Sequence, residues 1–497
     1  MNPEKTEPME IAINASCNTA TLSPYIPSGG NPWNVAKIKH TYRRLGFGVN
    51  IMQVDDALAL TPSNFIDSLV DTAANLPPTP TPVWGYYAVS DFADFENDNN
   101  QYVFDWRIQT GNDIIAETFR GRMSFFWMNH FVTELESVFY APYMFQYYNM
   151  MQVNVLGNYK EFVRSVGKNN NMLLYLNGFE NTNNDPNENY ARELFELFTL
   201  GEGNNYTQND ITETARALTG YNHWTEPGAD IYFDASTFDN GDKTIFNQTG
   251  NWGYEDVIDI LFAERSTEIA THICRKLYEF FVSPDVDTLI EANIITPLAQ
   301  ALISNNFELV PMLKQLFKSE HFYDERAVGV VIKSPVDIIF NFVNDSNFFF
   351  NTDLMEAFLY YAGLMGQEIY DPPDVSGWQR DETWINSSTL TGRWELMEIY
   401  IGFLFNSGYE FSLVDLAREL SNDSNNPEFI TQVMVDHFVP KTLHTLTDYE
   451  AATDIFKWEI PQNYYDDGTW NLSWTEAPYQ CLLLLVHICR MPEFQLK

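Results

Sequence analysis

The chain has 497 residues, and its composition excludes several classes of protein. It contains 28 Lys and Arg against 68 Asp and Glu, so the formal net charge is −40 at pH 7. This charge argues against nucleic-acid binding and against docking on an anionic membrane, since both need a basic face. Hydrophobic residues make up 45% of the chain, which is enough for a folded core and is not typical of disorder.

The beginning of the chain lacks the basic and apolar regions of a signal peptide. No stretch contains the roughly 18 apolar residues that a membrane-spanning helix needs. The four cysteines, Cys17, Cys274, Cys481 and Cys489, have no metal-binding spacing and are too few for a disulfide scaffold. These features predict a cytoplasmic protein by default, with no membrane span.

The N-terminal part of the chain divides into an arm, a helical segment and a connector. Residues 1–33 are rich in Asn, Ser, Pro and Gly, and they predict an extended N-terminal arm. Residues 34–75 predict two helices, the first capped by Asn34. Residues 76–84 form a stiff proline-rich connector, the best candidate for a boundary in the chain. Residues 85–497 then form the main helical body.

From about residue 102 a helical period dominates almost to the end of the chain. Helices are expected at about 103–135, 141–165, 186–199, 208–219, 254–281, 286–319, 330–344, 353–364, 388–407, 425–438 and 473–489. Residues 231–246 instead predict a β-hairpin on the Asn-Gly turn at 240–241. The predicted fold is therefore mainly α, a large multi-helix single domain with one small β-hairpin and an extended N-terminal arm.

The strongest functional signal is the polar segment 185–203. Asp185 as a cap, Pro186 in the first turn and Glu188 in a capping box predict the start of a helix, and Gly201 predicts its end. At 100° per residue, five polar residues share an arc of about 140°. These residues, called here the polar face, are Glu188, Asn189, Arg192, Glu193 and Glu196.

Two interpretations of the polar face are open. In the first it is a solvated surface on which Arg192 is paired with Glu188 and Glu196, each pair contributing only about 0.3–0.5 kcal/mol. In the second it faces a crevice, where Glu193 and Glu196 form a carboxylate pair for divalent-cation binding or acid–base chemistry. A calcium-binding loop is excluded because Tyr190 stands where that loop needs glycine.

Several motifs taken together resemble one known family. They are residues 187–201 (Asn-Glu-Asn-Tyr-Ala-Arg-Glu-Leu-Phe-Glu-Leu-Phe-Thr-Leu-Gly), 206–211, 215–220, 42–48 (Tyr-Arg-Arg-Leu-Gly-Phe-Gly), 126–131 (Phe-Trp-Met-Asn-His-Phe), 239–244, 333–337 (Lys-Ser-Pro-Val-Asp), 366–378 (Gly-Gln-Glu-Ile-Tyr-Asp-Pro-Pro-Asp-Val-Ser-Gly-Trp) and 491–496. This set resembles the bacterial DUF1800 family of unknown function over nearly the whole chain. The resemblance implies one family domain and no particular activity.

The resemblance also bears on compartment, partners and metal. Relatives are often exported and often encoded beside a sulfatase-like protein, which implies an extracytoplasmic location and a sulfatase-like partner. Relatives frequently carry His where this chain has Phe198, and a His-Asp pair where it has Phe238-Asp239. A metal site in this chain would therefore need oxygen ligands, with Glu193 and Glu196 as candidates, and would suit calcium or magnesium. No nucleotide-binding motif is present.

Two further places carry candidate residues. Asn129 and His130 lie on an aromatic-rich helix, where His130 is either a hydrogen-bonded core residue or a base beside the polar face. Trp378 and Trp384 lie on and after a stiff Pro-Pro loop. They either pin that loop to the body, which is favoured, or form a stacking platform for sugars.

Two functions from different classes fit the sequence. The favoured one is a binding or assembly protein, whose polar groove holds a partner such as the sulfatase-like protein. The binding candidates are Glu188, Asn189, Asn129, Trp378 and Trp384. The alternative is a hydrolase that uses Glu193 and Glu196, with Arg192 orienting an anionic group and His130 as a further candidate. The first is favoured because the sequence offers no complete catalytic set.

Overall fold

Helices make up most of the structure, a computed structural model that describes residues 21–497. The N-terminal helices are α1 (Val35–Leu45), α2 (Ile51–Leu58) and α3 (Pro62–Asn75). The Asn34 side chain accepts a hydrogen bond from a backbone N–H in the first turn of α1, so the predicted cap is confirmed. The segment 34–75 holds three helices, not two, because Asn50 and Gln53 form a capping box that begins α2.

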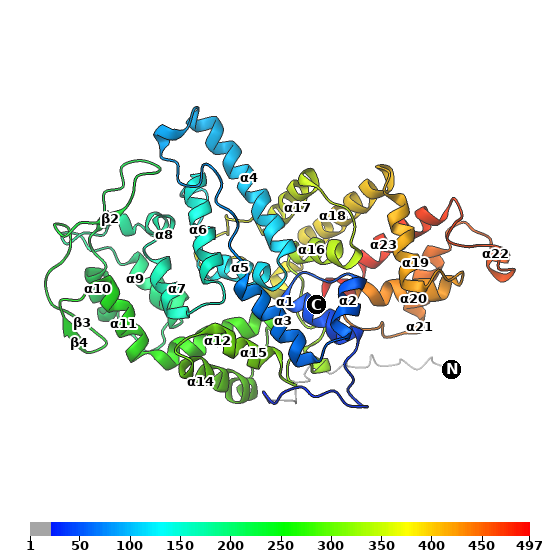
Figure 1. The fold of residues 1–497 in the computed structure, drawn as a ribbon, viewed down its shortest axis with the longest axis horizontal. Helices are drawn as coiled ribbons and strands as arrows, with labels where there is room; N and C mark the ends of the chain where they lie inside the picture. The colour runs from blue at the N-terminus through cyan, green and yellow to red at the C-terminus, as the bar shows by residue number, and fades with distance from the viewer. Residues whose placement is uncertain (1–20) are drawn as a thin grey trace, which may run out of the picture.

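The rest of the chain is an almost continuous series of helices (Figure 1). The central ones are α4 (Phe95–Ala116), α5 (Phe119–His130), α6 (Ala141–Asn154), α7 (Tyr159–Val166), α8 (Asn170–Tyr175), α9 (Asn189–Glu193), α10 (Gln208–Ala217), α11 (Tyr254–Glu264), α12 (Ser266–Phe281), α13 (Thr288–Ile290), α14 (Thr296–Ser304), α15 (Leu309–Phe317), α16 (Pro335–Ser346) and α17 (Thr352–Leu364). The C-terminal ones are α18 (Ser387–Asn406), α19 (Glu410–Ser421), α20 (Pro427–Phe438), α21 (Leu446–Phe456), α22 (Asn463–Asp466) and α23 (Ala477–Arg490). No helix of residues 21–497 is both long enough and apolar enough to cross a membrane.

Short helical turns of other types connect these elements. Two are π-helical, η3 (Leu194–Thr199) and η4 (Glu291–Ile295). The 3₁₀ turns are η1 (Val89–Asp91), η2 (Gly178–Glu180), η5 (Glu325–Ala327), η6 (Asp381–Trp384) and η7 (Glu493–Gln495).

Some helices expected to be continuous are divided in the structure. The one expected over 103–135 is two helices, α4 and α5, which separate at Thr118, where the backbone φ is 48°. A Cβ atom at Gly121 would collide with the carbonyl oxygen of Ile114, so glycine permits the close approach of these two helices. In addition, α19 and α21 lie where the periodicity predicted no helix.

The prediction of a single β-hairpin over 231–246 was wrong in its strand pairing. Two small antiparallel sheets form instead, one from β1 (Tyr221–Asn222) and β2 (Tyr232–Phe233), the other from β3 (Lys243–Ile245) and β4 (Gln248–Gly250). The turn of the second sheet lies at 246–247, where φ is 48° and 67°. The expected Asn-Gly turn is held against α10, because the carboxylate of Asp239 accepts hydrogen bonds from Arg216 (2.8 Å) and from the N–H of Gly241 (2.8 Å).

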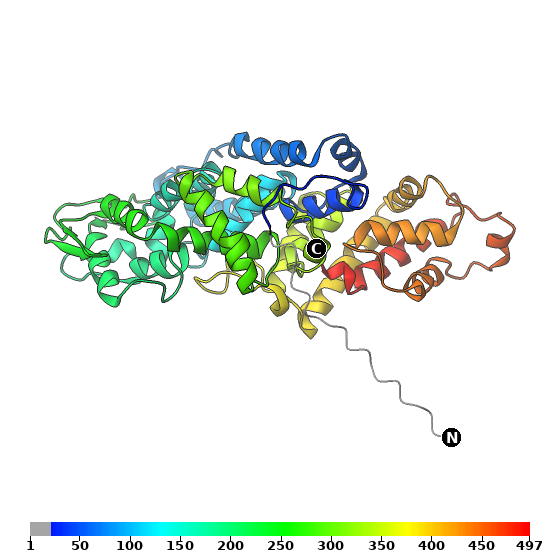
Figure 2. The same cartoon turned by 90° about the horizontal axis from the view of Figure 1, so that it is seen from below.

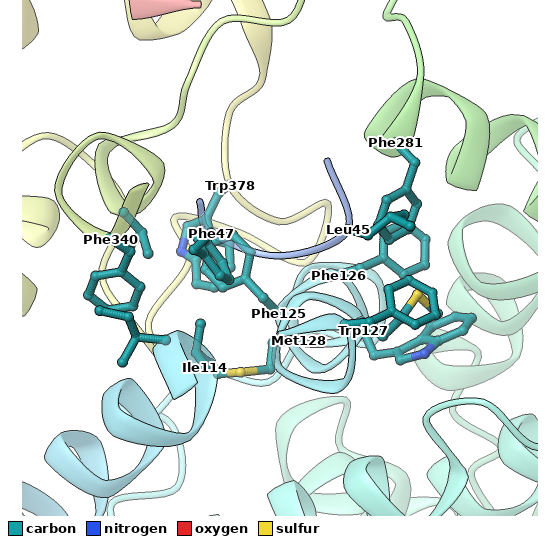
Figure 3. Packing of buried hydrophobic residues seen from close by; sticks show 14 of the residues in the cluster. Leu45, Phe47, Ile114, Phe125, Phe126, Trp127, Met128, Phe281, Phe340 and Trp378 are labelled. Atoms are coloured by element: carbon teal, nitrogen blue, oxygen red, sulfur yellow. The ribbon is translucent and has the colours of Figure 1, made fainter. Parts of the chain in front are cut away.

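One hydrophobic core joins the N-terminal helices to the C-terminal ones, with members from Tyr25 to Phe494. The molecule is elongated, with the two sheets at one end and α19–α23 at the other (Figures 1 and 2). Near its centre, the ring of Phe125 of α5 contacts the rings of Phe47 (5.7 Å between centroids) and Trp378 (5.1 Å), which are labelled in Figure 3. The prevalence of helices confirms the predicted mainly α fold.

The described part of the N-terminal arm, residues 21–33, contains no helix. It lies against the segment that follows α15, because the N–H of Tyr25 donates to the carbonyl of Lys318 (2.8 Å). The remainder of the predicted arm, residues 1–20, lies outside the described residues.

The proline-rich segment 76–84 packs directly on the helices around it. The N–H of Thr79 donates to the side-chain oxygen of Gln152 (2.9 Å), and the Thr79 hydroxyl donates to Asp113 (2.6 Å). These contacts tie the segment to α4 and α6.

Charge is distributed unequally between the interior and the surface. Within residues 21–497, eight Lys or Arg side chains are buried, against three Asp and no Glu. The cationic ones are Arg43, Arg44, Arg120, Arg122, Lys243, Lys333, Arg393 and Lys497, and the anionic ones are Asp113, Asp337 and Asp345. Most acids therefore lie at the surface, where the net negative charge is concentrated.

Candidate functional site

The helix that carries the polar face begins three residues later than predicted, at Asn189. Asp185 does not cap it, because Asp185 pairs with Thr182 in an isolated β-bridge. The side-chain oxygen of Asn187 instead accepts a hydrogen bond from the N–H of Asn189 (2.9 Å), and the Asn189 side chain is exposed.

After Glu193 the helix widens into the π-helix η3. Its hydrogen bonds span five residues, as in the bond from the N–H of Leu200 to the carbonyl of Phe195 (2.8 Å). The arc derived from 100° per residue therefore does not apply beyond Glu193. Single π-turns of this kind occur often at functional sites.

Arg192 forms ion pairs with both carboxylates that bracket it, Glu188 (3.0 Å) and Glu196 (3.3 Å). Glu188 also accepts hydrogen bonds from Thr212 (2.7 Å) and Gln208 (2.8 Å) of α10. The Arg192 side chain is 37% exposed, and the two carboxylate side chains are 33% and 22% exposed. Water screens pairs with this exposure, so they contribute little to stability.

Glu193 differs from its neighbours on the polar face. Burial, then the negative charge of Glu196, raises the pKa of Glu193. Its side chain has no hydrogen bond or ion pair with the part of the chain that the structure describes. In the same part of the chain, no three His, Cys, Asp or Glu side chains are grouped so that they could hold a metal ion. Glu193 and Glu196 thus supply two candidate oxygen ligands, and the predicted divalent-cation site stays a prediction.

His130 contacts the backbone of the helix that carries the polar face, not its carboxylates. Its Nε2 lies 3.1 Å from the hydroxyl of Tyr159 and 3.3 Å from the carbonyl of Phe198. Tyr159 itself donates to the Phe198 carbonyl, and the Nε2 of His272 lies 3.2 Å from the carbonyl of Leu197. These side chains satisfy carbonyls at the C-terminal end of η3, groups that a helix leaves without partners.

The charges around His130 are cationic. Burial lowers the pKa of His130 well below its ordinary value, and the nearby Lys276, His272 and Arg380 lower it further. The imidazole is therefore neutral at physiological pH. A base beside the polar-face carboxylates would instead have a raised pKa. The structure therefore favours the interpretation of His130 as a hydrogen-bonded core residue.

A separate pocket of about 300 Å³ lies against α5 and is lined by three of the predicted binding residues, Asn129, Trp378 and Trp384. Its other walls come from the end of α12, from residues 331–337 and from the loop that leads into η6. We call it the Trp384 pocket. Its volume is at the lower end of the range for small-molecule sites.

The loop that bears Trp378 is fixed to α5 by backbone geometry. Asn129 accepts a hydrogen bond from the N–H of Trp378 (2.6 Å), and the Trp378 indole donates to the carbonyl of Glu368 (3.0 Å). Gly377 has a φ of 93°, in the left-handed region, and a Cβ atom there would collide with the side-chain oxygen of Asn129. Trp378 is 4% exposed and Trp384 is 3% exposed, so both rings pack against the body.

The Trp384 pocket is rich in unused hydrogen-bond donors. Backbone N–H groups hold the oxygens of Asn129 and Gln367, the latter through Val336 (2.9 Å), and this leaves both amide nitrogens without a partner in residues 21–497. The indole N–H of Trp384 also lacks a partner there, although the ring is almost fully buried. In each side chain the atom that faces a backbone N–H must be the acceptor, which is the amide oxygen. The orientation of both amides is therefore fixed.

A buried charge cluster forms the floor of the pocket. Arg122 donates to one oxygen of Asp337 (2.5 Å), and Lys497 donates to the other. The Arg122 guanidinium lies between the rings of Phe47 (4.6 Å) and Phe280 (4.5 Å). Burial alone would raise the pKa of Asp337, but the two cations outweigh it and hold that pKa well below its ordinary value. Burial, then the charge of Arg122, lowers the pKa of Lys497.

Two more charged groups line the mouth of the pocket. Arg380 donates to Glu279 (3.3 Å), and Glu279 also lines a neighbouring cavity. Asp381 has a φ of 50° and a buried oxygen that lacks a hydrogen-bond partner in the described chain. Burial raises the pKa of Asp381, and the charges of Glu382 and Asp285 raise it as well.

The motifs that carry the family resemblance meet at this pocket. Asn129 belongs to the motif 126–131, Asp337 to 333–337, and both Gln367 and Trp378 to 366–378. Lys497 directly follows the motif 491–496.

Fold and pocket together define a class, a large helical protein with an internal pocket lined by hydrogen-bond donors over a buried cation cluster. The chain belongs to the DUF1800 family, described as "protein of unknown function", whose family model matches residues 40–496. No curated protein and no solved structure matches the chain.

Several pocket residues were not candidates from the sequence, namely Arg122, Asp337, Gln367 and Asp381. No local spacing relates them, since Arg122 and Asp337 are 215 positions apart and Asp337 and Lys497 are 160 apart. The only sequence signal for these residues was the set of separate family motifs. Finding the pocket from them would have required the assumption that the motifs converge in the folded chain.

Proposed function

We propose that this protein is a binding protein whose Trp384 pocket receives an anionic group of a small ligand or of a partner. The supporting observation is that Asn129, Gln367 and Trp384, which line the pocket together with the buried Arg122, each carry a hydrogen-bond donor without a partner in residues 21–497. Donors without partners favour a group that only accepts hydrogen bonds, such as a carboxylate or a sulfate.

The aromatic walls narrow the class of ligand. Phe280 and Trp384 line the pocket beside the donors, so a flat or ring-shaped body can pack on them while its anionic group meets the N–H groups. An aromatic carboxylate or an aromatic sulfate ester has both parts. The ligand class is thus an organic anion with a ring close to its charge.

The polar face is a second part of the proposal. Glu188, Asn189 and Arg192 are exposed or half-exposed, and none of them lines the Trp384 pocket. We assign them to contacts with a partner protein, for which the sulfatase-like neighbour implied by the family resemblance is the first candidate. Arg192 and its two carboxylates can re-pair across such an interface without burying an unpaired charge.

The pocket proposal is tested with benzoate and phenyl sulfate as probes. Isothermal titration should show saturable binding to the full chain, and replacing Gln367 with Glu should abolish it, since a carboxylate then faces the bound anion. Trp384→Phe keeps the ring, loses the N–H donor, and should weaken binding about 5- to 10-fold. Trp458→Phe, a change of a 47%-exposed tryptophan at the far end of the molecule, is the control and should bind normally. Equal binding by the wild type and Gln367→Glu would refute the proposal.

A second candidate function, a carboxylate-based hydrolase, is favoured by the raised pKa of Glu193 and by the neighbouring carboxylate of Glu196. A carboxyl group with a raised pKa keeps its proton to a higher pH than an ordinary glutamate does, which suits a general acid. Hydrolysis of p-nitrophenyl esters and glycosides, and bound calcium and magnesium, would be measured for the wild type, Glu193→Gln and Glu196→Gln. Activity or metal lost in both variants would support this candidate. Values equal to those of the wild type would exclude these carboxylates.

A further inference from the structure

A second cavity, of about 540 Å³, is a neighbour of the Trp384 pocket and shares Glu279 with it. One wall is the face of α12 that carries His272, Arg275 and Lys276, and the other is the loop 200–204. We call it the Lys276 cavity. None of its residues was a candidate from the sequence, and the proposed function does not use it.

Lys276 is a cation without a counterion. It lines the cavity, it is half-buried, and its ammonium group has no hydrogen bond or ion pair with any described residue. Glu279 lies one turn along α12 but is paired with Arg380. Of the 12 lysines in residues 21–497, six have an acidic partner, as Lys457 has Glu428 (2.5 Å).

Arg275 and Arg380 add two positive charges near Lys276, against the acids Glu202, Glu279 and Glu291, of which Glu279 and Glu291 are paired with the two arginines. Arg275 binds Glu291 through two nitrogens (3.1 and 2.8 Å), which leaves its third nitrogen without a partner in residues 21–497. Burial, then the charge of Arg380, lowers the pKa of Lys276 to about 8, against a smaller opposite effect of Glu279. Cations that disfavour each other in this way are stabilised by an anion placed between them.

His272 offers the cavity no hydrogen-bond donor. Its Nε2 lies 3.2 Å from the carbonyl of Leu197, and its pKa is lowered to about 4 by burial and by Lys276. The ring is neutral at pH 7, so it donates through Nε2 to that carbonyl and its Nδ1 carries no proton. The donors left for a ligand are the ammonium of Lys276 and the free nitrogen of Arg275.

We propose that the Lys276 cavity is a second ligand site, which binds an oxyanion group (sulfate, phosphate or carboxylate) between Lys276 and Arg275. It is distinct from the Trp384 pocket, because the two share only Glu279 among their lining residues. The cavity is wide and largely polar, so it takes a hydrated oxyanion or the charged end of a larger molecule.

The test compares sodium sulfate, phosphate and acetate with sodium chloride at equal ionic strength and pH 7. We expect oxyanions to raise the Tm of the wild type by several degrees over chloride, and Lys276→Met to lose most of that rise. Lys276→Arg keeps the charge and should retain it. Lys457→Met, which removes a paired surface lysine, is the matched control and should respond as the wild type does. An equal sulfate effect in the wild type and Lys276→Met would overturn the proposal.

A second experiment measures the reactivity of Lys276 directly in the wild type, so it does not depend on the folding of any variant. Trace acetylation of the wild type with acetic anhydride, followed by peptide mass spectrometry, gives the reactivity of each lysine. Sulfate should slow the acetylation of Lys276 several-fold and leave that of Lys457 unchanged. Unchanged acetylation of Lys276 at saturating sulfate would overturn the proposal, whether or not probes bind in the Trp384 pocket.

Discussion

At the scale of single residues, Asp381 is the group in the Trp384 pocket whose charge opposes the proposed ligand. Of the three acids that line the pocket, Glu279 and Asp337 are neutralised by cations, whereas Asp381 has a buried oxygen without a partner in residues 21–497. Its raised pKa means that it gains a proton at a higher pH than an ordinary aspartate does. A protonated Asp381 no longer repels an anion and can donate to it.

This predicts a pH dependence for ligand binding. Phenyl sulfate remains anionic throughout, so its affinity for the wild type should rise as the pH is lowered from neutrality toward the ordinary aspartate pKa of 3.8. Asp381→Asn should bind more tightly at pH 7 and lose this dependence, because the amide carries no charge at any pH. Titration calorimetry across that range measures both. A wild-type affinity that falls with decreasing pH would contradict the prediction.

Asp337 is the residue on which the floor of the pocket depends. Asp337→Asn leaves Arg122 and Lys497 buried without a negative charge between them, which should destabilise the protein by about 3–5 kcal/mol. Denaturant unfolding at pH 7 measures this. Asp415→Asn removes a carboxylate that is 67% exposed from a surface pair with Arg418 and should cost less than about 1 kcal/mol.

The sign of the pH effect at Asp337 follows from its lowered pKa. The folded-state pKa lies below the ordinary value of 3.8, so the carboxylate stabilises the fold fully above that value. The contribution is lost as the pH falls below about 3.8 toward the folded-state pKa. The difference in stability between the wild type and Asp337→Asn should therefore shrink on acidification. A difference that grows below pH 4 would contradict this assignment.

At the scale of elements, the loop 366–378 brings distant parts of the chain together. It is held because Gly377 adopts a left-handed conformation and lies directly on Asn129 of α5. The same loop supplies Gln367 and Trp378, so its seating determines the shape of the pocket.

Replacing Gly377 with Ala should disturb this seating. The φ of 93° strains any residue with a Cβ atom, and that atom would also collide with Asn129, so we expect a loss of at least about 2 kcal/mol. Gly408→Ala is a matched control, since its φ is 88° but nothing lies within 4 Å of the added atom. The difference in unfolding free energy between the two variants measures the contact with Asn129. Equal losses in the two variants would show that backbone strain alone is responsible.

At the scale of the whole molecule, acids at the surface surround an interior that is rich in buried cations. The net charge of −40 makes neighbouring surface carboxylates repel one another, whereas interior pairs such as Arg43–Asp345 (2.9 Å) are shielded from water. Salt screens the first kind of interaction far more than the second.

We therefore expect salt to stabilise the protein. Raising NaCl from about 0.1 M to about 1 M shortens the screening length from about 10 Å to about 3 Å, which weakens surface repulsion, so the Tm should increase. Differential scanning calorimetry in NaCl and KCl would measure this, and equal effects of both salts would point to screening. A Tm that falls with salt would show that attractive surface pairs outweigh the repulsion.

The sequence predicted what depends on neighbouring residues. The cap at Asn34, the run of helices and the mainly α class follow from side chains within one or two turns, which interact wherever the chain goes. The Asn-Gly hairpin was wrong because a contact with α10 decided the local conformation of Asp239, and the helix at 189 starts late because Asp185 pairs with Thr182.

Only the tertiary structure decided where the candidate sites lie. The sequence pointed to the polar face because its charges are close together along one helix, and the structure shows Arg192 paired with Glu188 and Glu196 at a half-exposed surface. The Trp384 pocket and the Lys276 cavity are built from residues far apart in the chain. Both are recognised by hydrogen-bond donors that have no partner in residues 21–497. Spacing along a chain cannot reveal an unsatisfied donor, because satisfaction depends on every segment that packs around it.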